Sequence, residues 1–202
     1  MTIRKCLLLA LLPFFLSACA VQNPSVESQF YLLSSDSEVF QKPADAPVIG
    51  LKPVTVADYL ENKGIAVLTD TNRLRIANYH YWAESPDTAI TRVMHSELNR
   101  YMPNYAVDNG QLGRNSDWKL NLEIHIDQFH GTEDGRAVFS GYWRLSDTDN
   151  ALIRKRFNFS APLEEPGYAP LVSKLRQLLS ELAQKQANEV AALLEEAPSP
   201  QN

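Results

Sequence analysis

The sequence has little cysteine, little glycine and no surplus of basic side chains. Its 202 residues contain two cysteines and eight glycines, and 19 lysines and arginines stand against 24 aspartates and glutamates. The formal net charge is therefore −5 at neutral pH. Because nucleic-acid-binding domains need a basic surface, this balance argues against nucleic acid as a partner, and against docking on anionic lipid headgroups by charge alone.

Sequence motifs of catalysis are also missing. The chain contains no Gly-x-Ser-x-Gly elbow, no glycine-rich phosphate loop and no His-Glu-x-x-His pattern. These absences predict a protein that is not an enzyme, with no catalytic residue, no bound metal and no cofactor.

The apolar run at the N-terminus is too short to span a bilayer. Residues 6–16 form a run of about 11 residues, against the roughly 20 that a transmembrane helix needs, and Arg4 and Lys5 precede it. A charged start followed by a short apolar core is typical of a secretory signal peptide. We expect residues 1–18 to be this peptide, and its removal takes two cations away from an already acidic chain.

The end of this segment resembles a bacterial lipobox, with Leu16, Ser17 and Ala18 followed directly by Cys19. The resemblance implies that the chain is cut between Ala18 and Cys19. It also implies that diacylglycerol is attached to the Cys19 sulfur, and that the new amine receives an acyl chain such as palmitate. Three acyl chains make release from a membrane negligible. Ala20 is not the aspartate that commonly retains bacterial lipoproteins in the inner membrane, so the implied location is the periplasmic face of the outer membrane.

Four segments follow from these observations. Residues 1–18 are the signal peptide that is removed, and residues 19–29 are the acylated cysteine and a polar tether. Residues 30–194 are expected to form a single periplasmic domain, and residues 195–202 a disordered tail. Because Cys19 is consumed by acylation, the folded domain holds no disulfide and depends on its core for stability.

Two helices are predicted. Ser85 and Pro86 are typical of a helix start, and an apolar stripe then runs to Tyr101 before Pro103 ends the helix. A second stripe begins at Leu171. Lys185 and Gln186 interrupt this second stripe, so we expect the distal half of that helix to pack only lightly.

Strands are predicted before, between and after these helices. Short apolar runs occur at residues 30–33, 48–54, 65–68, 73–77 and 105–107, and residues 118–126 alternate between apolar and polar side chains. The phase slips after Ile126, which indicates a bulge or a strand end. Residues 136–146 and 152–161 complete a three-strand antiparallel meander. The predicted fold class is α+β, with one mixed, mainly antiparallel sheet and two amphipathic helices packed on one face.

Two groups of side chains are candidates for a site. Glu123, His125 and Asp127 share one side of a strand, with His130 close by, and such a cluster could hold a divalent metal. The interpretation that we favour is an ordinary solvated face, because alternation demands polar residues there.

The second group is aromatic. Tyr79, Tyr81 and Trp82 are candidates for binding a partner protein, since aromatic side chains offer large contact area and few rotatable bonds. For Trp82 we favour a place in the core, where the chain turns into the first helix. Tyr79 and Tyr81 share a face in an extended segment and are better candidates for an exposed contact.

The order of features along the chain resembles the PqiC family of ABC-type transport auxiliary lipoproteins. The similar elements are listed in chain order: the lipobox at Cys19; Phe30, Tyr31, Leu32 and Leu33; Pro53, Val54, Thr55 and Val56, with Tyr59 and Leu60 behind them; Asn72, Arg73 and Leu74; Trp82, Ala83 and Glu84; a helix ending near Leu98; a long alternating strand with Phe129; and a C-terminal helix.

The resemblance implies a non-catalytic outer-membrane lipoprotein of an MCE-type lipid-transport system. Its implied partners are an MCE-domain protein that forms a tunnel across the periplasm, and the tunnel's inner-membrane partner. The lipoprotein would dock the tunnel at the outer membrane, as part of a homo-oligomeric ring, and support envelope integrity.

The alternative function is that of a monomeric carrier, which would bind a lipid or an acyl chain in a cavity between sheet and helices. We expect bulky side chains to fill that space instead, namely Phe139, Trp143, Phe157 and Phe159.

Overall fold

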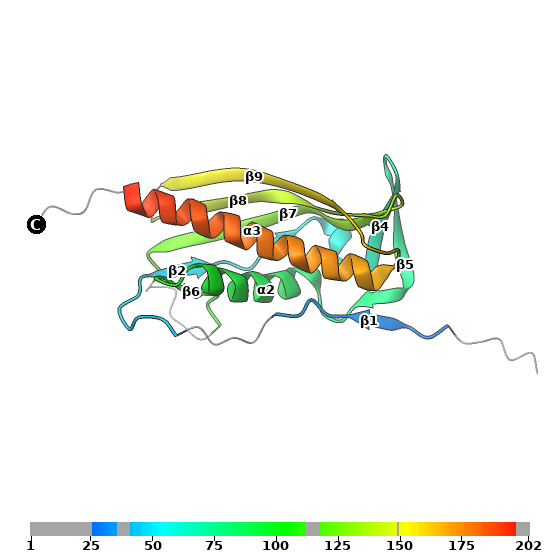
Figure 1. Ribbon diagram of the computed structural model, residues 1–202, viewed down its shortest axis with the longest axis horizontal. Helices are drawn as coiled ribbons and strands as arrows, with labels where there is room; N and C mark the ends of the chain where they lie inside the picture. Colours follow the sequence, from blue (N-terminus) through cyan, green and yellow to red (C-terminus); the bar gives the residue numbers. More distant parts are fainter. Residues whose placement is uncertain (1–25, 36–40, 112–117, 149, 197–202) are drawn as a thin grey trace, which may run out of the picture.

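Two helices lie across one face of a single mixed sheet in the computed structural model, which describes residues 26–35, 41–111, 118–148 and 150–196 (Figure 1). The helices are α2 (Pro86–Tyr101) and α3 (Tyr168–Glu196). Within the described residues the sheet has nine strands. The predicted α+β class, with two helices on one face, is confirmed. The signal peptide and the lipidation site at Ala18 and Cys19 lie outside the described residues.

The sheet is built around β7 (Leu120–Thr132), its longest strand. Along one edge, β7 pairs antiparallel with β8 (Arg136–Ser146), which in turn pairs antiparallel with β9 (Ala151–Pro162). This is the predicted meander. It follows from the alternation of apolar and polar residues and from the turn at Gly135, whose φ of 75° is in the left-handed region that favours glycine.

The other edge of β7 is divided among three short strands, all parallel to it. These are β2 (Val48–Leu51), β3 (Thr55–Val56) and β4 (Gly64–Asp70). A turn of 3-10 helix, η2 (Asp58–Glu61), lies between β3 and β4. Beyond β2 the sheet continues with β6 (Ala106–Asp108).

Beyond β4 the sheet ends with two strands. The hairpin partner of β4 is β5 (Arg73–Trp82), and β1 (Gln29–Tyr31) forms the outer edge, parallel to β5. The antiparallel pairs β4–β5, β7–β8 and β8–β9 hold most of the residue pairings, so the sheet is mixed but mainly antiparallel.

The bulge predicted after Ile126 is present. The register between β7 and β8 shifts between Ile126 and Gln128, and Gly141 of β8 lies opposite Ile126. A Cβ atom at Gly141 would lie 2.0 Å from the carbonyl oxygen of His125, so the strands approach closely only because this residue is glycine. After the bulge, Phe129 rejoins the buried face.

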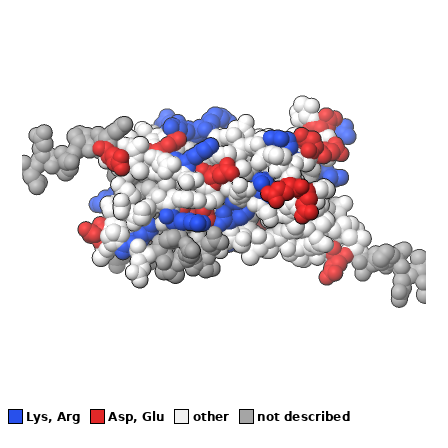
Figure 2. Space-filling model, viewed as in Figure 1, with Lys and Arg blue, Asp and Glu red and all other residues white. Residues whose placement is uncertain are grey.

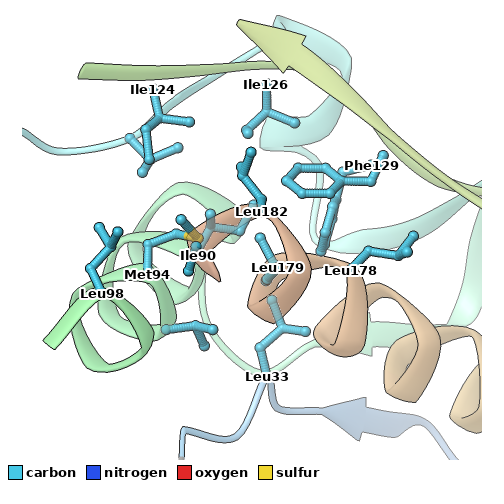
Figure 3. Packing of buried hydrophobic residues seen from close by; sticks show 14 of the residues in the cluster. Leu33, Ile90, Met94, Leu98, Ile124, Ile126, Phe129, Leu178, Leu179 and Leu182 are labelled. Atoms are coloured by element: carbon cyan, nitrogen blue, oxygen red, sulfur yellow. The ribbon is translucent and has the colours of Figure 1, made fainter. Parts of the chain in front are cut away.

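The core lies between the sheet and the two helices (Figure 3). Side chains from α2, α3 and β7 meet there, and Leu33 closes the lower side from the segment after β1. The labelled residues of the cluster are Leu33, Ile90, Met94, Leu98, Ile124, Ile126, Phe129, Leu178, Leu179 and Leu182.

Three expectations from the sequence need correction. The strand expected at residues 73–77 extends to Trp82, so the aromatic group belongs to β5. The distal half of α3 does not pack lightly, because Gln186 and Val190 are buried. The helix also continues to Glu196, so the first two residues of the expected disordered tail are helical, and residues 197–202 lie outside the described part of the chain. Within the described residues, neither helix has the length and apolarity to cross a membrane.

Candidate functional site

The aromatic residues of β5 divide between the two faces of the sheet. Trp82 is 5% exposed, and its ring lies 5.8 Å from that of Phe129, so it belongs to the core, as favoured from the sequence. His80 also faces the helices, where its ring stacks on Tyr168 of α3 at 4.0 Å between centroids. Tyr79 and Tyr81 alternate with these residues and lie on the opposite face of the sheet. Of the three predicted partner-binding residues, Tyr79 and Tyr81 therefore face outward and Trp82 does not.

An exposed apolar patch results at the edge of the sheet. Phe30 of β1 pairs with Tyr81 of β5, and their ring centroids are 5.6 Å apart. Phe30 is 69% exposed, Leu32 is 56% exposed and Tyr79 is 46% exposed. We call these side chains, Phe30, Leu32, Tyr79 and Tyr81, the β1–β5 patch.

A second surface lies on the helix-free face of the sheet. It is a hollow of about 710 Å³ at the middle of β7, β8 and β9, and the end of β2 and the start of β3 close one side of it. We call it the sheet groove. Its polar lining consists of Lys52, Thr55, Glu123, His125, Tyr142, Arg144, Arg154, Lys155 and Arg156.

Ion pairs organise the floor of the sheet groove. The carboxylate of Glu123 accepts hydrogen bonds from Lys52 on one side and Arg144 on the other. The hydrogen bond from Lys52, together with that from Arg144, holds the pKa of Glu123 below its ordinary value despite partial burial. Glu123 is therefore a charged anchor that fixes two cations, and it is not a proton donor at neutral pH.

The predicted acidic and histidine cluster is present on one face but is occupied by protein groups. His125 Nδ1 lies 2.7 Å from the hydroxyl of Thr55, and Arg156 donates to Asp127 over 3.0 Å. Within the described ranges, no group of three or more His, Cys, Asp or Glu side chains is arranged to hold a metal ion. The geometry therefore favours the solvated-face interpretation over the metal site.

His130 is separate from this cluster. It is buried beside Tyr59 of η2, and its Nδ1 lies 2.9 Å from the carbonyl oxygen of Gly131. Burial lowers the pKa of His130 below its ordinary value. The same burial raises the pKa of Tyr59 to about 12, so both side chains are neutral at physiological pH.

The sheet groove keeps a surplus of positive charge. Arg154 lines it and has no ion-pair partner among the described residues, whereas Arg144 and Arg156 are paired. Tyr142, 47% exposed, adds an aromatic ring that lies 4.9 Å from His125. Figure 2 shows the opposite, helix side of the molecule, where acidic and basic side chains are interspersed.

The sequence interpretation missed these cations as a group. Arg144 lies on β8, Arg154 and Arg156 lie on β9, and Lys52 directly follows β2; none of them is part of a motif. The available signal was the alternation of β8 and β9, which places residues 144, 154 and 156 on the polar face of the predicted meander. Nothing in the sequence indicated that β2 would bring Lys52 beside them.

Comparisons with known proteins agree with this architecture. The intermembrane transport lipoprotein PqiC of Escherichia coli K12 is 28% identical over 146 residues, which cover 72% of this chain and 76% of that protein. The protein of the same name in Shigella flexneri matches to the same extent.

Solved structures share the fold. A crystal structure of an uncharacterised protein superposes with a TM-score of 0.72 at 26% identity, over 81% of this chain and 99% of that one. A protein of Xanthomonas campestris superposes with a TM-score of 0.69 at 13% identity, over 84% of this chain and 98% of that one, and shows the fold alone. A family model described as the ABC-type transport auxiliary lipoprotein component matches residues 31–187. This chain belongs to the family of ABC-type transport auxiliary lipoprotein components.

Proposed function

We propose that the protein is a non-catalytic lipoprotein of an MCE-type intermembrane lipid-transport system, held in the outer membrane by acyl chains on Cys19. It docks the periplasmic end of an MCE-domain tunnel at that membrane, as one subunit of a closed ring. Family membership over residues 31–187 and the similarity to intermembrane transport lipoproteins support this role.

The filled core favours docking over lipid carriage. A carrier needs an apolar cavity between the sheet and the helices. In that layer Phe129 and Phe139 pack edge to face at 5.6 Å between centroids, and Phe139 and Phe159 stack at 5.9 Å. Trp143 is buried beside them, and Phe157 packs against the same cluster. These side chains occupy the space that an acyl chain would need.

The sheet groove is the surface that we assign to the tunnel. It is hollowed and lies on the sheet face that neither helix covers. It presents an exposed tyrosine and the guanidinium of Arg154, which pairs with no carboxylate in the part of the chain that the structure describes. Arginine and tyrosine are enriched among the residues that dominate protein interfaces. An acidic or carbonyl-rich edge of the tunnel protein would complement the surplus positive charge.

A charge reversal tests this assignment. Full-length tagged protein is extracted from membranes in mild detergent, and the MCE-domain protein that co-purifies is measured by mass spectrometry. Arg154→Glu is expected to reduce its recovery about tenfold, as for a charge reversal within an interface. Arg75→Glu makes the same charge reversal at an exposed residue of β5 and is the matched control. This variant is expected to recover as much MCE-domain protein as the unchanged protein does.

Native mass spectrometry of the same extract distinguishes the two functions. A ring-sized oligomer with the tunnel protein attached supports docking. A monomer that retains one lipid molecule, with equal recovery for both variants, would overturn it in favour of a carrier. Cys19→Ala is expected to release a folded domain into the periplasm, and continued membrane residence of this variant would contradict the acyl anchor.

A further inference from the structure

The residues that alternate with the β1–β5 patch along β1 and β5 point inward and make contacts inside the protein. On the helix side of the same two strands, the hydroxyl of Tyr31 lies 2.9 Å from His80 Nδ1, and Trp82 is buried. Phe30, Leu32, Tyr79 and Tyr81 alternate with these residues, so the pleat turns them away from the core. The exposure of Phe30, Leu32 and Tyr79 therefore follows from the strand register.

The chain that leads to the patch carries the anchor. The described structure begins at Val26, which is itself 61% exposed, and enters β1 at Gln29. Seven residues, 19–25, connect Val26 to the acyl chains proposed on Cys19, and such a length of chain reaches at most about 25 Å. The membrane surface is therefore always close to the patch, at a high effective concentration.

The chemistry of the patch fits the boundary between lipid headgroups and acyl chains. Tyrosine and other aromatic side chains prefer this region, because their rings are apolar while the phenol hydroxyl stays hydrated. Lys63 is exposed and directly precedes Gly64, the pair partner of Tyr81, and its ammonium suits phosphate groups. Figure 2 shows mostly uncharged surface over β1, with acidic atoms at the start of the described chain.

A protein partner fits the patch less well. A stable protein interface buries about 800 Å² on each side, which the four side chains of the patch do not supply. A membrane contact needs less area, because the anchor already holds the protein at the surface. A second copy of the chain could also pair a strand with the free edge of β1, but β1 is short and offers few backbone hydrogen bonds for such pairing.

We propose that the β1–β5 patch inserts into the headgroup region of the membrane that holds the Cys19 anchor, and so fixes the orientation of the domain. The inference rests on the proposed acylation of Cys19. Attachment at one point leaves the domain free to turn, whereas a second contact at β1 selects one orientation. In that orientation the patch lies on the lipid, and the helix-free face of the sheet stands at a fixed angle to the membrane plane.

The test places one fluorescent probe on each surface. In the acylated full-length protein, Tyr79→Cys and Tyr142→Cys introduce single reactive thiols, since the Cys19 sulfur is blocked by the lipid. The two tyrosines are nearly equally exposed, at 46% and 47%, so Tyr142 is a matched control. Each variant is labelled with a nitrobenzoxadiazole dye and reconstituted into vesicles of phosphatidylethanolamine and phosphatidylglycerol, with and without nitroxide-labelled lipid.

We expect nitroxide lipid to quench the probe at position 79 at least about twofold more strongly than the probe at position 142. Equal quenching at both positions would overturn the inference, and so would a blue-shifted probe at position 79 that nitroxide lipid does not quench, since that result means contact with protein. Adding Phe30→Asp and Leu32→Asp to Tyr79→Cys is expected to abolish the difference while circular dichroism stays unchanged.

Failure of the inference is distinguishable from failure of the proposed function. The intact mass of the reconstituted protein reports acylation independently of the probe. An acylated, membrane-bound protein without selective quenching would refute the patch contact and leave the lipoprotein role standing. An unmodified Cys19 would refute the anchor itself.

Discussion

The guanidinium of Arg176 on α3 donates a hydrogen bond to the carboxylate of Glu97 on α2 over 2.5 Å and joins the two helices inside the molecule. Glu97 is only 1% exposed, and its second oxygen accepts a hydrogen bond from Ser180 at 2.6 Å. The hydroxyls of Tyr101 and Ser180 lie 3.0 Å apart, which extends the network along the helix pair. This network fixes how α2 and α3 pack on the sheet.

Replacing Glu97 with alanine should destabilise the domain strongly. The change leaves the largely buried Arg176 guanidinium without its carboxylate, although its hydrogen bond to the carbonyl oxygen of Ser34 remains, and breaking a buried pair from one side costs roughly 3 kcal/mol. Urea unfolding of the Cys19→Ala form measures this loss. Glu164→Ala removes a carboxylate that is 88% exposed from its pair with Lys174, and should cost less than about 1 kcal/mol. Equal losses in the two variants would show that the Glu97 pair has no special role.

Replacing Gln186 with leucine should stabilise the protein. Gln186 is fully buried in α3, and neither its amide nitrogen nor its amide oxygen has a hydrogen-bond partner among the described residues. A buried amide without partners costs roughly 1–3 kcal/mol, and leucine of similar size removes that cost. The urea midpoint of Gln186→Leu is expected to rise, while that of Gln177→Leu, an exposed position on the same helix, is expected to stay within experimental error. A lower midpoint for Gln186→Leu would show that the amide is satisfied by a bound water.

Stability should fall when the pH drops below the ordinary pKa of histidine. Burial lowers the pKa of folded His130 from its ordinary 6.5, so the unfolded chain takes up a proton before the folded chain does. The contribution of this histidine to the free energy of unfolding is complete above about pH 6.5 and is lost as the pH falls towards the folded pKa.

Urea unfolding at a series of pH values tests this linkage. His130→Phe is expected to flatten the dependence between about pH 7 and 5, because no group at that position then titrates. Glu123→Gln serves as the comparison. The pKa of Glu123 is also lowered in the folded state, from 4.5, so its linkage acts at lower pH and the slope above about pH 5 should remain. An unchanged slope in His130→Phe would contradict the assignment to His130.

Much of the fold was predictable from local patterns. The alternation from residue 118 to Ile126 fixed the buried face of β7, and the phase slip after Ile126 is the bulge opposite Gly141. Proline at the start of α2 and the apolar stripe behind it defined that helix almost to the residue. Such signals are reliable because the backbone sets periods of 2 and 3.6 residues wherever one side of an element is buried.

The burial of Gln186 shows where pattern reading failed. Lys185 and Gln186 interrupt the apolar stripe and suggested a lightly packed distal helix. Lys185 instead lies over the ring of Phe159 with its ammonium 4.4 Å from the centroid, while Gln186 is covered completely. Lys185 keeps its ammonium at the surface while it covers an apolar ring, and Gln186 is buried with its amide, so neither residue marks a gap in packing.

The sequence by itself determined the class of the fold, the faces of its helices and strands, and the lipobox resemblance at Cys19. The tertiary structure alone decided that β7 shares one edge with three short parallel strands, which brings Lys52 to Glu123, and that β1 lies beside β5, which brings Phe30 to Tyr81. The alternation of apolar and polar residues is a property of each strand by itself, so the sequence of a strand indicates which of its faces is buried. The choice of neighbour depends on contacts between distant segments with similar apolar patterns, and only the packed chain selects among them.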